Sequence, residues 1–100
     1  MSRKVYTVDE IKDIVCQVAK EYGIERVTLF GSYARGEAKP DSDVDLRIDK
    51  GQLRGIFQLS GFLLDLEEQL NTRVDVLTTD SISGHFLERI KKEEILLYEH

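Results

Sequence analysis

The chain has 100 residues, of which 41% are hydrophobic and 33% are charged, and its formal net charge is −5. This composition is typical of a folded protein, and the length favours a single domain over residues 1–100. The acidic balance argues against direct binding to nucleic acid, which needs a basic surface. Short apolar runs argue against a membrane span, and the lone cysteine, Cys16, excludes a disulfide within the chain, so we expect a reducing, cytoplasmic location.

The apolar periodicity predicts seven elements in the order helix, strand, strand, helix, strand, helix, strand. Thr7 and Glu10 match a capping box that begins the first helix, and Gly23 suits its end. Further helices are predicted over 52–70 and 84–93, strands over 26–30, 44–48, 73–78 and 95–98, and a turn with room for a short helical piece over 31–38. This order indicates an α/β (α+β) fold class, with a small mixed β-sheet flanked by helices.

The long helix predicted over 52–70 carries a wide apolar arc. The stripe expected to cover the sheet consists of Leu53, Ile56, Leu59, Leu63, Leu66 and Leu70. Phe57 and Leu64 fall to one side of this stripe and Phe62 falls to the other, so the arc spans roughly 220°. Either neighbouring helices cover both flanks, or the helix offers apolar surface to a partner protein or to a second copy of the chain, as in a homodimer.

Three aspartates recur on the polar side of the predicted strands. Side chains alternate along a strand, so Asp43 and Asp45 point to one face while Val44 and Leu46 point to the core. Asp75 repeats this pattern and approaches Asp45 if the two strands are neighbours. Like charges this close repel unless a cation lies between them, and Mg²⁺ prefers such ligands. The trio predicts a site for two Mg²⁺ ions, with Mn²⁺ as a substitute; the alternative is a solvated strand face that ends in a turn.

Gly31 and Ser32 interrupt an apolar run where the first strand should end. Glycine permits a close backbone approach, and the N–H groups of a turn together with a serine hydroxyl form an anion site. If the first two strands are antiparallel neighbours, this anion site and the carboxylates of Asp43 and Asp45 meet at one edge of the sheet. Phosphates held by the turn would then reach metal ions held by the aspartates.

Phosphoryl or nucleotidyl transfer is the chemistry that needs such a set of groups. Asp75 would bridge a metal or accept the proton of an attacking hydroxyl. Arg35 and Lys39 follow in the loop and are candidates to neutralise phosphates, although Lys39 is better explained as a solvated charge. His85 has no His or Cys partner at metal-binding spacing, so we interpret it as a surface residue.

The spacing from Gly31-Ser32 through ten residues to Asp43-Val44-Asp45 resembles the signature of the nucleotidyltransferase superfamily that includes DNA polymerase beta. The fuller string GSYARGEAKPDSDVDL and the short chain resemble its minimal nucleotidyltransferase (MNT) branch, which includes the MntA-like antitoxins. The resemblance implies a polymerase beta-like fold in which Gly31 and Ser32 hold the triphosphate. It also implies that Asp43 and Asp45 bind metal, and that Asp75 completes the catalytic carboxylates.

Members of the MNT branch are commonly antitoxins paired with helical HEPN-type ribonuclease toxins, and they move AMP from ATP onto a tyrosine of the toxin. The resemblance therefore implies an ATP-dependent protein adenylyltransferase whose partner is a HEPN-type toxin. Two alternatives remain. A small-molecule nucleotidyltransferase is disfavoured because about 100 residues leave no second domain for an acceptor pocket. A non-catalytic antitoxin would neutralise its partner by contact alone.

Overall fold

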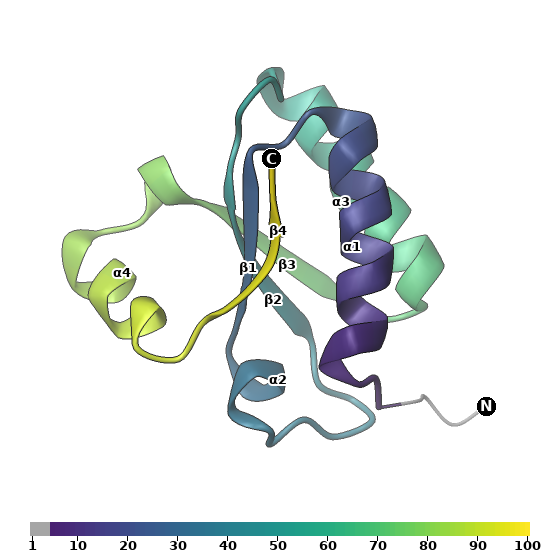
Figure 1. Cartoon of the computed structure of the whole chain (residues 1–100), viewed down its shortest axis with the longest axis vertical. Helices are drawn as coiled ribbons and strands as arrows, with labels where there is room; N and C mark the ends of the chain where they lie inside the picture. The colour runs from purple at the N-terminus through teal and green to yellow at the C-terminus, as the bar shows by residue number, and fades with distance from the viewer. Residues whose placement is uncertain (1–4) are drawn as a thin grey trace.

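The computed structural model describes residues 5–100 and contains a four-stranded sheet with helices on both sides (Figure 1). The helices are α1 (Val8–Tyr22), α2 (Ser32–Arg35), α3 (Gly55–Leu70) and α4 (Gly84–Lys91), with a 3₁₀ helix, η1, over Thr79–Ser81. The strands are β1 (Arg26–Phe30), β2 (Val44–Asp49), β3 (Val74–Thr78) and β4 (Ile95–Glu99). The predicted order of elements and the α/β class are confirmed, and the short helical piece of the turn is α2.

The sheet is mixed, as expected, with strand order β3-β2-β1-β4. β1 is antiparallel to both of its neighbours, β2 and β4, whereas β2 and β3 run parallel. This topology brings the end of β1 and the beginnings of β2 and β3 to one edge of the sheet, and α2 lies at that edge (Figure 1). The polar residues predicted to act together come from these three strand ends.

The first helix has both of its predicted end signals. Thr7 accepts a hydrogen bond from the backbone N–H of Glu10, and the Glu10 side chain accepts one from the N–H of Thr7, so the capping box is complete. Gly23 ends α1 in the left-handed conformation. The apolar stripe of the helix packs against the sheet, and Ile11, Val15 and Val18 are fully buried.

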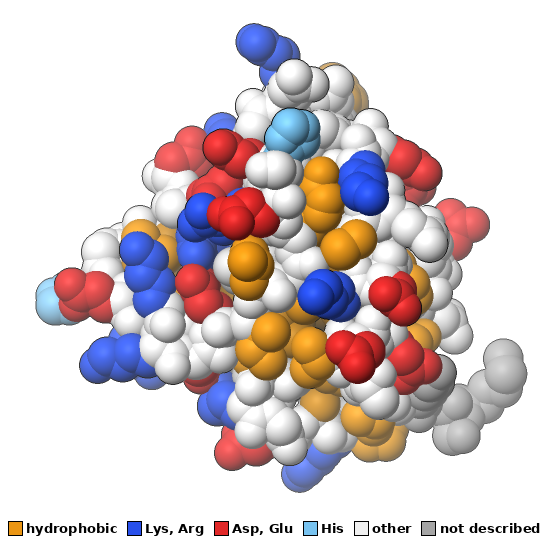
Figure 2. Space-filling model, in the orientation of Figure 1, with side chains coloured by type: hydrophobic (Ala, Val, Ile, Leu, Met, Phe, Trp, Pro, Cys, Tyr) orange, Lys and Arg blue, Asp and Glu red, His pale blue; other side chains and the backbone are white. Residues whose placement is uncertain are grey.

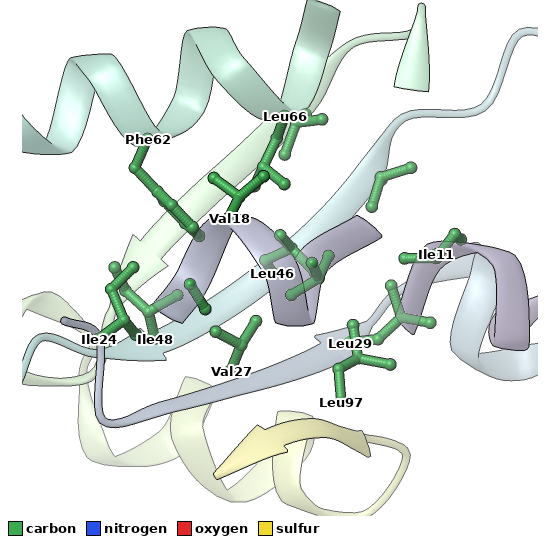
Figure 3. Close-up of a cluster of buried hydrophobic side chains, with 14 of the residues drawn as sticks. Ile11, Val18, Ile24, Val27, Leu29, Leu46, Ile48, Phe62, Leu66 and Leu97 are labelled. Carbon is green, nitrogen blue, oxygen red and sulfur yellow. The ribbon is translucent and has the colours of Figure 1, made fainter. Parts of the chain in front are cut away.

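The main core lies between the sheet and the helix pair α1 and α3. Figure 3 shows Val18 of α1, Phe62 and Leu66 of α3, and Leu46 of β2 pointing into one cluster. Tyr22 of α1 packs edge-on against Phe62, with ring centroids 5.8 Å apart, and its hydroxyl donates to Asp65 at 2.7 Å. These contacts hold α1 against α3, so the two helices form one layer behind the sheet.

Helix α3 differs from its prediction in two respects. It begins at Gly55 rather than at Gln52, because residues 50–53 form a turn in which Gln52 donates its N–H to the carbonyl of Gly23. Phe62, expected on a flank, is completely buried, whereas Ile56, expected in the core stripe, is 72% exposed. The flank that carries Phe62 is covered by α1, and the first turn of α3, which holds Ile56, is not packed into the core.

The flank of α3 that carries Phe57 and Leu64 is not covered by another helix of the described residues. This agrees with the sequence-based alternative in which the helix offers apolar surface to another chain. Phe57 is 90% exposed and Leu64 is 62% exposed, so both present apolar surface. That this flank meets another chain stays a prediction. On the face drawn in Figure 2, basic and acidic side chains are interspersed, so that face carries no continuous basic surface. Among residues 5–100, no helix has the length and apolar character needed to cross a membrane.

Candidate active site

Gly31 brings the end of β1 directly against Asp45. Its backbone has φ 77° and ψ −154°, a conformation that strongly favours glycine. A Cβ atom at this position would lie 2.2 Å from Oδ2 of Asp45, which leaves no room for any side chain. Phe30 pairs with Asp45 across β1 and β2, so the register of the sheet fixes this contact. The close backbone approach predicted at Gly31 is present, and the group that it approaches is a carboxylate.

The short helix α2 continues from Gly31 and is anchored by Tyr33. Tyr33 is buried in the main core, and Gly36 ends the helix in the left-handed conformation. Ser32, the first helical residue, is half-buried beside Gly31. This anchoring holds the glycine, the serine hydroxyl and Asp45 at one edge of the sheet, as the sequence predicts.

The three predicted aspartates come from two adjacent parallel strands. Asp45 of β2 and Asp75 of β3 are register partners, so their side chains stand next to each other on the same face. Asp43 lies just before β2 and is half-buried, Asp45 is half-buried, and Asp75 is exposed. The predicted pairing of Asp45 with Asp75 is therefore confirmed, although the functional roles of the three residues remain predictions.

The surroundings of Asp45 favour its protonated form. Burial, repulsion from Asp75 and from Asp43, and a hydrogen bond with Asp75 raise the pKa of Asp45 to about 6, against a weaker opposing effect from Arg35. Two carboxyl groups that share a hydrogen bond are held together by a proton in the absence of a cation. At neutral pH the carboxylates therefore repel one another, and a proton or a bound cation would relieve this repulsion.

We expect Asp45→Asn to stabilise the metal-free protein at alkaline pH. Because the folded-state pKa of Asp45 is raised from 3.8 to about 6, its favourable protonation is complete in acid and is lost as the pH rises through about 6. The variant should therefore gain about 1 kcal/mol at pH 8, a value discounted for the partial solvent exposure of the side chain, and roughly half of that at pH 5, because the gain builds up between pH 3.8 and about 6. Urea unfolding in EDTA at both pH values measures this, with Asp41→Asn as the exposed control. A variant less stable than wild type at pH 8 would contradict the assignment.

The three aspartates are of the residue type that binds a divalent cation, but their side chains are not already arranged around one point. Among residues 5–100, no three His, Cys, Asp or Glu side chains converge closely enough to form a ready metal site. Asp45 and Asp75 nevertheless adjoin and share a hydrogen bond, and Asp43 acts on Asp45 through its charge. Mg²⁺ prefers carboxylate oxygens, and a cation bound here would offset the repulsion that the shared proton otherwise relieves. Asp43, Asp45 and Asp75 are therefore the residues that would hold metal.

A hollow of about 380 Å³ opens beside these groups, between the end of β1 and α4. It is lined by Phe30, Gly31, Ser32, Arg35, Asp45, Phe86, Arg89, Ile90 and Glu93. A larger hollow of about 530 Å³ lies at the opposite end of β1, around Gly23, Gly51 and His100. The smaller hollow is the candidate active site, because it combines two carboxylates, two arginines and the backbone of Gly31, whereas the larger one contains none of the predicted site residues.

Arg35 lines this hollow but is already paired with two carboxylates. Its Nε donates to Oε1 of Glu37 at 2.9 Å, and its Nη1 lies 3.2 Å from Oε2 of Glu93. Glu93 also accepts a hydrogen bond of 3.1 Å from the backbone N–H of Gly31. The predicted anion-binding groups thus face a side-chain carboxylate in this structure.

A buried ion pair fixes the segment that carries Glu93. Arg47 of β2 is 4% exposed, and its guanidinium binds the neighbouring residue, Glu94, with a shortest N–O distance of 2.8 Å. The hydroxyl of Thr28 donates to the same carboxylate at 3.1 Å. These contacts explain why α4 ends at Lys91 instead of continuing to Glu93 as the sequence predicted: both glutamates turn toward the sheet.

Sequence reasoning missed Phe86, Arg89 and Glu93 as residues of the site. Phe86 and Arg89 are three positions apart and therefore share one face of α4, which is the only local signal they give. In the part of the chain that the structure describes, the Arg89 guanidinium has no hydrogen bond or ion pair. Unlike Arg35, it is therefore a basic side chain in the hollow that is not already paired with a carboxylate. Arg47 did offer a signal, because a charged residue in a central strand needs a buried partner.

The other residues considered from the sequence lie outside this hollow. Lys39 and His85 are exposed, as expected. Cys16 is half-buried, and its thiol donates to the carbonyl of Leu97 at 3.1 Å, which agrees with a packing role.

Comparison with known proteins places the chain among nucleotidyltransferases. The sequence profile of the family described as polymerase beta nucleotidyltransferase matches residues 10–100. The protein adenylyltransferase MntA of Thermococcus cleftensis is 32% identical over 93 residues, which cover 89% of this chain and 94% of that protein. A solved structure assigned as a minimal nucleotidyltransferase is 32% identical, with a TM-score of 0.78, and the match covers 89% of this chain and 91% of that one.

A more distant similarity is to a complex between a tri-AMPylated HEPN toxin of Shewanella oneidensis and an MNT antitoxin. The matching chain has a TM-score of 0.71 and 15% identity, and the match covers 93% of this chain and 73% of that one. At this level of identity the similarity shows a shared fold.

Proposed function

The chain belongs to the polymerase beta nucleotidyltransferase family, and we propose that it is a metal-dependent protein adenylyltransferase that transfers AMP from ATP to a tyrosine of a HEPN-type toxin. The observation that carries the proposal is the position of Asp45, which contacts Gly31 on one side and pairs with Asp75 on the other. The phosphate-binding turn and Asp45 thereby line one hollow, and Asp75 adjoins Asp45 on the next strand.

The predicted site residues divide into two roles in this reaction. Gly31, Ser32 and Arg35 bind and orient the triphosphate, since an amide N–H, a hydroxyl and a guanidinium all donate to phosphate oxygens. Asp43, Asp45 and Asp75 would hold two Mg²⁺ ions, or Mn²⁺ in their place; bound there, the metal would neutralise charge on the phosphates and on the leaving pyrophosphate. The protein mainly supplies position and charge compensation.

The bond changes define the reaction as adenylyl transfer. The acceptor tyrosine oxygen forms a bond to the α-phosphorus of ATP, the bond from that phosphorus to the β-phosphate oxygen breaks, and pyrophosphate leaves. The tyrosine proton must go to a nearby base, and Asp75 is suited to this because it is the exposed member of the trio. An exposed carboxylate beside Asp45 is also accessible to a residue on a second protein.

The similarity to known proteins supports the choice of acceptor. The Thermococcus relative is named a protein adenylyltransferase, and the Shewanella complex contains a HEPN toxin that carries AMP groups. We extend both properties to this chain as a proposal, with the toxin and ATP as its partners and the cytoplasm as its location. The free thiol of Cys16 fits a reducing compartment.

The test is transfer of label from α-³²P-ATP to a purified HEPN-type toxin in the presence of Mg²⁺. We expect the toxin to become labelled by wild-type protein, and we expect no label from γ-³²P-ATP, because the terminal phosphate leaves with pyrophosphate. A toxin in which the acceptor tyrosine is replaced by phenylalanine is the matched control. Neutralisation of the toxin without any transfer of label would show a contact-only antitoxin, and would overturn the proposal.

A further inference from the structure

The phosphate-binding groups of the proposed site are bonded to a carboxylate of the same chain. Oε1 of Glu93 accepts the N–H of Gly31 at 3.1 Å, and Oε2 of Glu93 lies 3.2 Å from Nη1 of Arg35. A carboxylate and a phosphate oxygen are both anionic acceptors that bind amide and guanidinium donors in similar ways. Glu93 therefore makes the contacts expected of one phosphate group of a nucleotide.

Contacts of the neighbouring residue and of the backbone hold Glu93 in place. Its neighbour Glu94 is held by the buried guanidinium of Arg47 and by the hydroxyl of Thr28. The backbone N–H groups of Glu93 and Glu94 both donate to the carbonyl of Ile90, at 3.0 and 2.9 Å. These contacts hold the backbone of Glu93, and its side chain is half-buried where it lines the hollow.

Glu93 and Asp45 both line the hollow, so the Glu93 carboxylate lies among the groups proposed to bind phosphate and metal. Its contacts to Gly31 and Arg35 can be replaced by those of a ligand that binds the same donors more strongly. A Mg²⁺-bound triphosphate brings several anionic oxygens together with the cation, so it competes well for the same donors. Phosphate and Glu93 cannot both accept the single N–H of Gly31 with full strength.

We propose that Glu93 is an internal competitor of the triphosphate: its carboxylate occupies the N–H of Gly31 and the guanidinium of Arg35 in the free protein, and the nucleotide binds by displacing it. This inference rests on the proposed function, because it takes Gly31 and Arg35 to be phosphate ligands. The arrangement sets nucleotide affinity below the value that the donors alone would give. It also keeps the amide and the guanidinium paired in the nucleotide-free state.

The test compares binding of Mg²⁺–ATP and of Mg²⁺–tripolyphosphate to wild type and to Glu93→Gln by calorimetry. The glutamine keeps the size of the side chain but removes its charge, so we expect both ligands to bind about tenfold more tightly, as for the loss of one charge-assisted competing contact. Glu37→Gln is the matched control, because Glu37 also pairs with Arg35 but is not bonded to Gly31. It should change affinity less. Glu88→Gln, on the exposed face of α4, controls for net charge.

The amide resonance of Gly31 gives a second readout that needs no nucleotide. In the free protein, Glu93→Gln should shift this ¹H–¹⁵N signal, because it loses a charged acceptor, whereas Glu37→Gln should leave it in place. Affinity equal to or weaker than that of wild type in Glu93→Gln would overturn the proposal and would mark Glu93 as a residue that positions Arg35. If Glu93→Gln binds the ligands more tightly but neither it nor wild type transfers AMP, only the proposed function is overturned. If wild type transfers AMP but Glu93→Gln binds the ligands as wild type does, only the role of Glu93 is overturned.

Discussion

Replacing Asp43 and Asp45 together by asparagine is expected to abolish the binding of ATP that depends on Mg²⁺ or Mn²⁺. The wild-type carboxylates repel a triphosphate when no metal is present, so the free protein should bind ATP only after the cation is added. Without the carboxylates the cation has no ligands at this edge of the sheet, and we expect a loss of affinity of at least about 100-fold. Titration calorimetry with and without metal measures both effects.

A control from the same loop separates this effect from a general loss of charge. Asp41→Asn removes an exposed carboxylate two residues before Asp43 and should leave the metal-dependent affinity unchanged. Unfolding of the double variant is not expected, because Asp45→Asn relieves repulsion with Asp75 and should stabilise the metal-free fold. Equal ATP affinity in the presence and absence of metal, or in the double variant, would rule out the metal site.

The strand ends of the site were predictable because several local signals agreed. Gly31 and Ser32 end one apolar run, Asp43 and Asp45 flank the start of the next, and each pattern has the period of a strand. Two conditions stated from the sequence, antiparallel pairing of the first two strands and adjacency of the second and third, are both met, and Asp45 pairs with Phe30 and with Asp75. Sequence therefore specified the carboxylate side of the site.

The α4 side of the site was not predictable, because it depends on contacts between residues far apart in the chain. Glu93 reaches Gly31 across 62 positions, and Glu94 reaches Arg47 across 47 positions. Nothing in the sequence around Glu93 distinguishes it from an ordinary charged residue at a helix end. The contact between Glu94 and the buried guanidinium of Arg47 exists only in the folded sheet. This contact positions the segment after α4 so that Glu93 lines the hollow.

Helix α3 illustrates the same limit for packing. The helical periodicity correctly located Leu66 and Leu70 in the core. It gives the direction of each side chain around the helix axis, but not which other elements pack against that side. Phe62 is buried because α1 lies on its side, where Tyr22 packs against it, and Gly61 permits this approach: a Cβ there would lie 2.9 Å from the Tyr22 hydroxyl. Ile56 has the same hydrophobicity as its buried neighbours, yet it remains exposed in the first turn of the helix.

Replacing Asp75 by asparagine is expected to abolish AMP transfer while weakening ATP binding less than Asp45→Asn does. Asp75 lies on the edge strand β3 and is exposed, whereas Asp45 is half-buried between Gly31 and Asp75. Asp75 is therefore one strand farther than Asp45 from the phosphate-binding turn at the end of β1. Loss of a general base or of a metal bridge at this point should lower the transfer rate by at least about 100-fold, with a change in ATP affinity of less than about tenfold.

The comparison is made by single-turnover transfer to the toxin and by calorimetry with ATP and Mg²⁺. Asp80→Asn is the control, because Asp80 is an exposed carboxylate in η1, just after the same strand, whose ion pair with Lys50 lies away from the hollow. A loss confined to the transfer rate assigns Asp75 to the transition state, since an interaction made only there leaves ground-state binding unchanged. A parallel loss of ATP affinity instead makes it chiefly a metal ligand. Transfer at a near-normal rate would remove Asp75 from the catalytic site, and the hydroxyl proton would then need another acceptor.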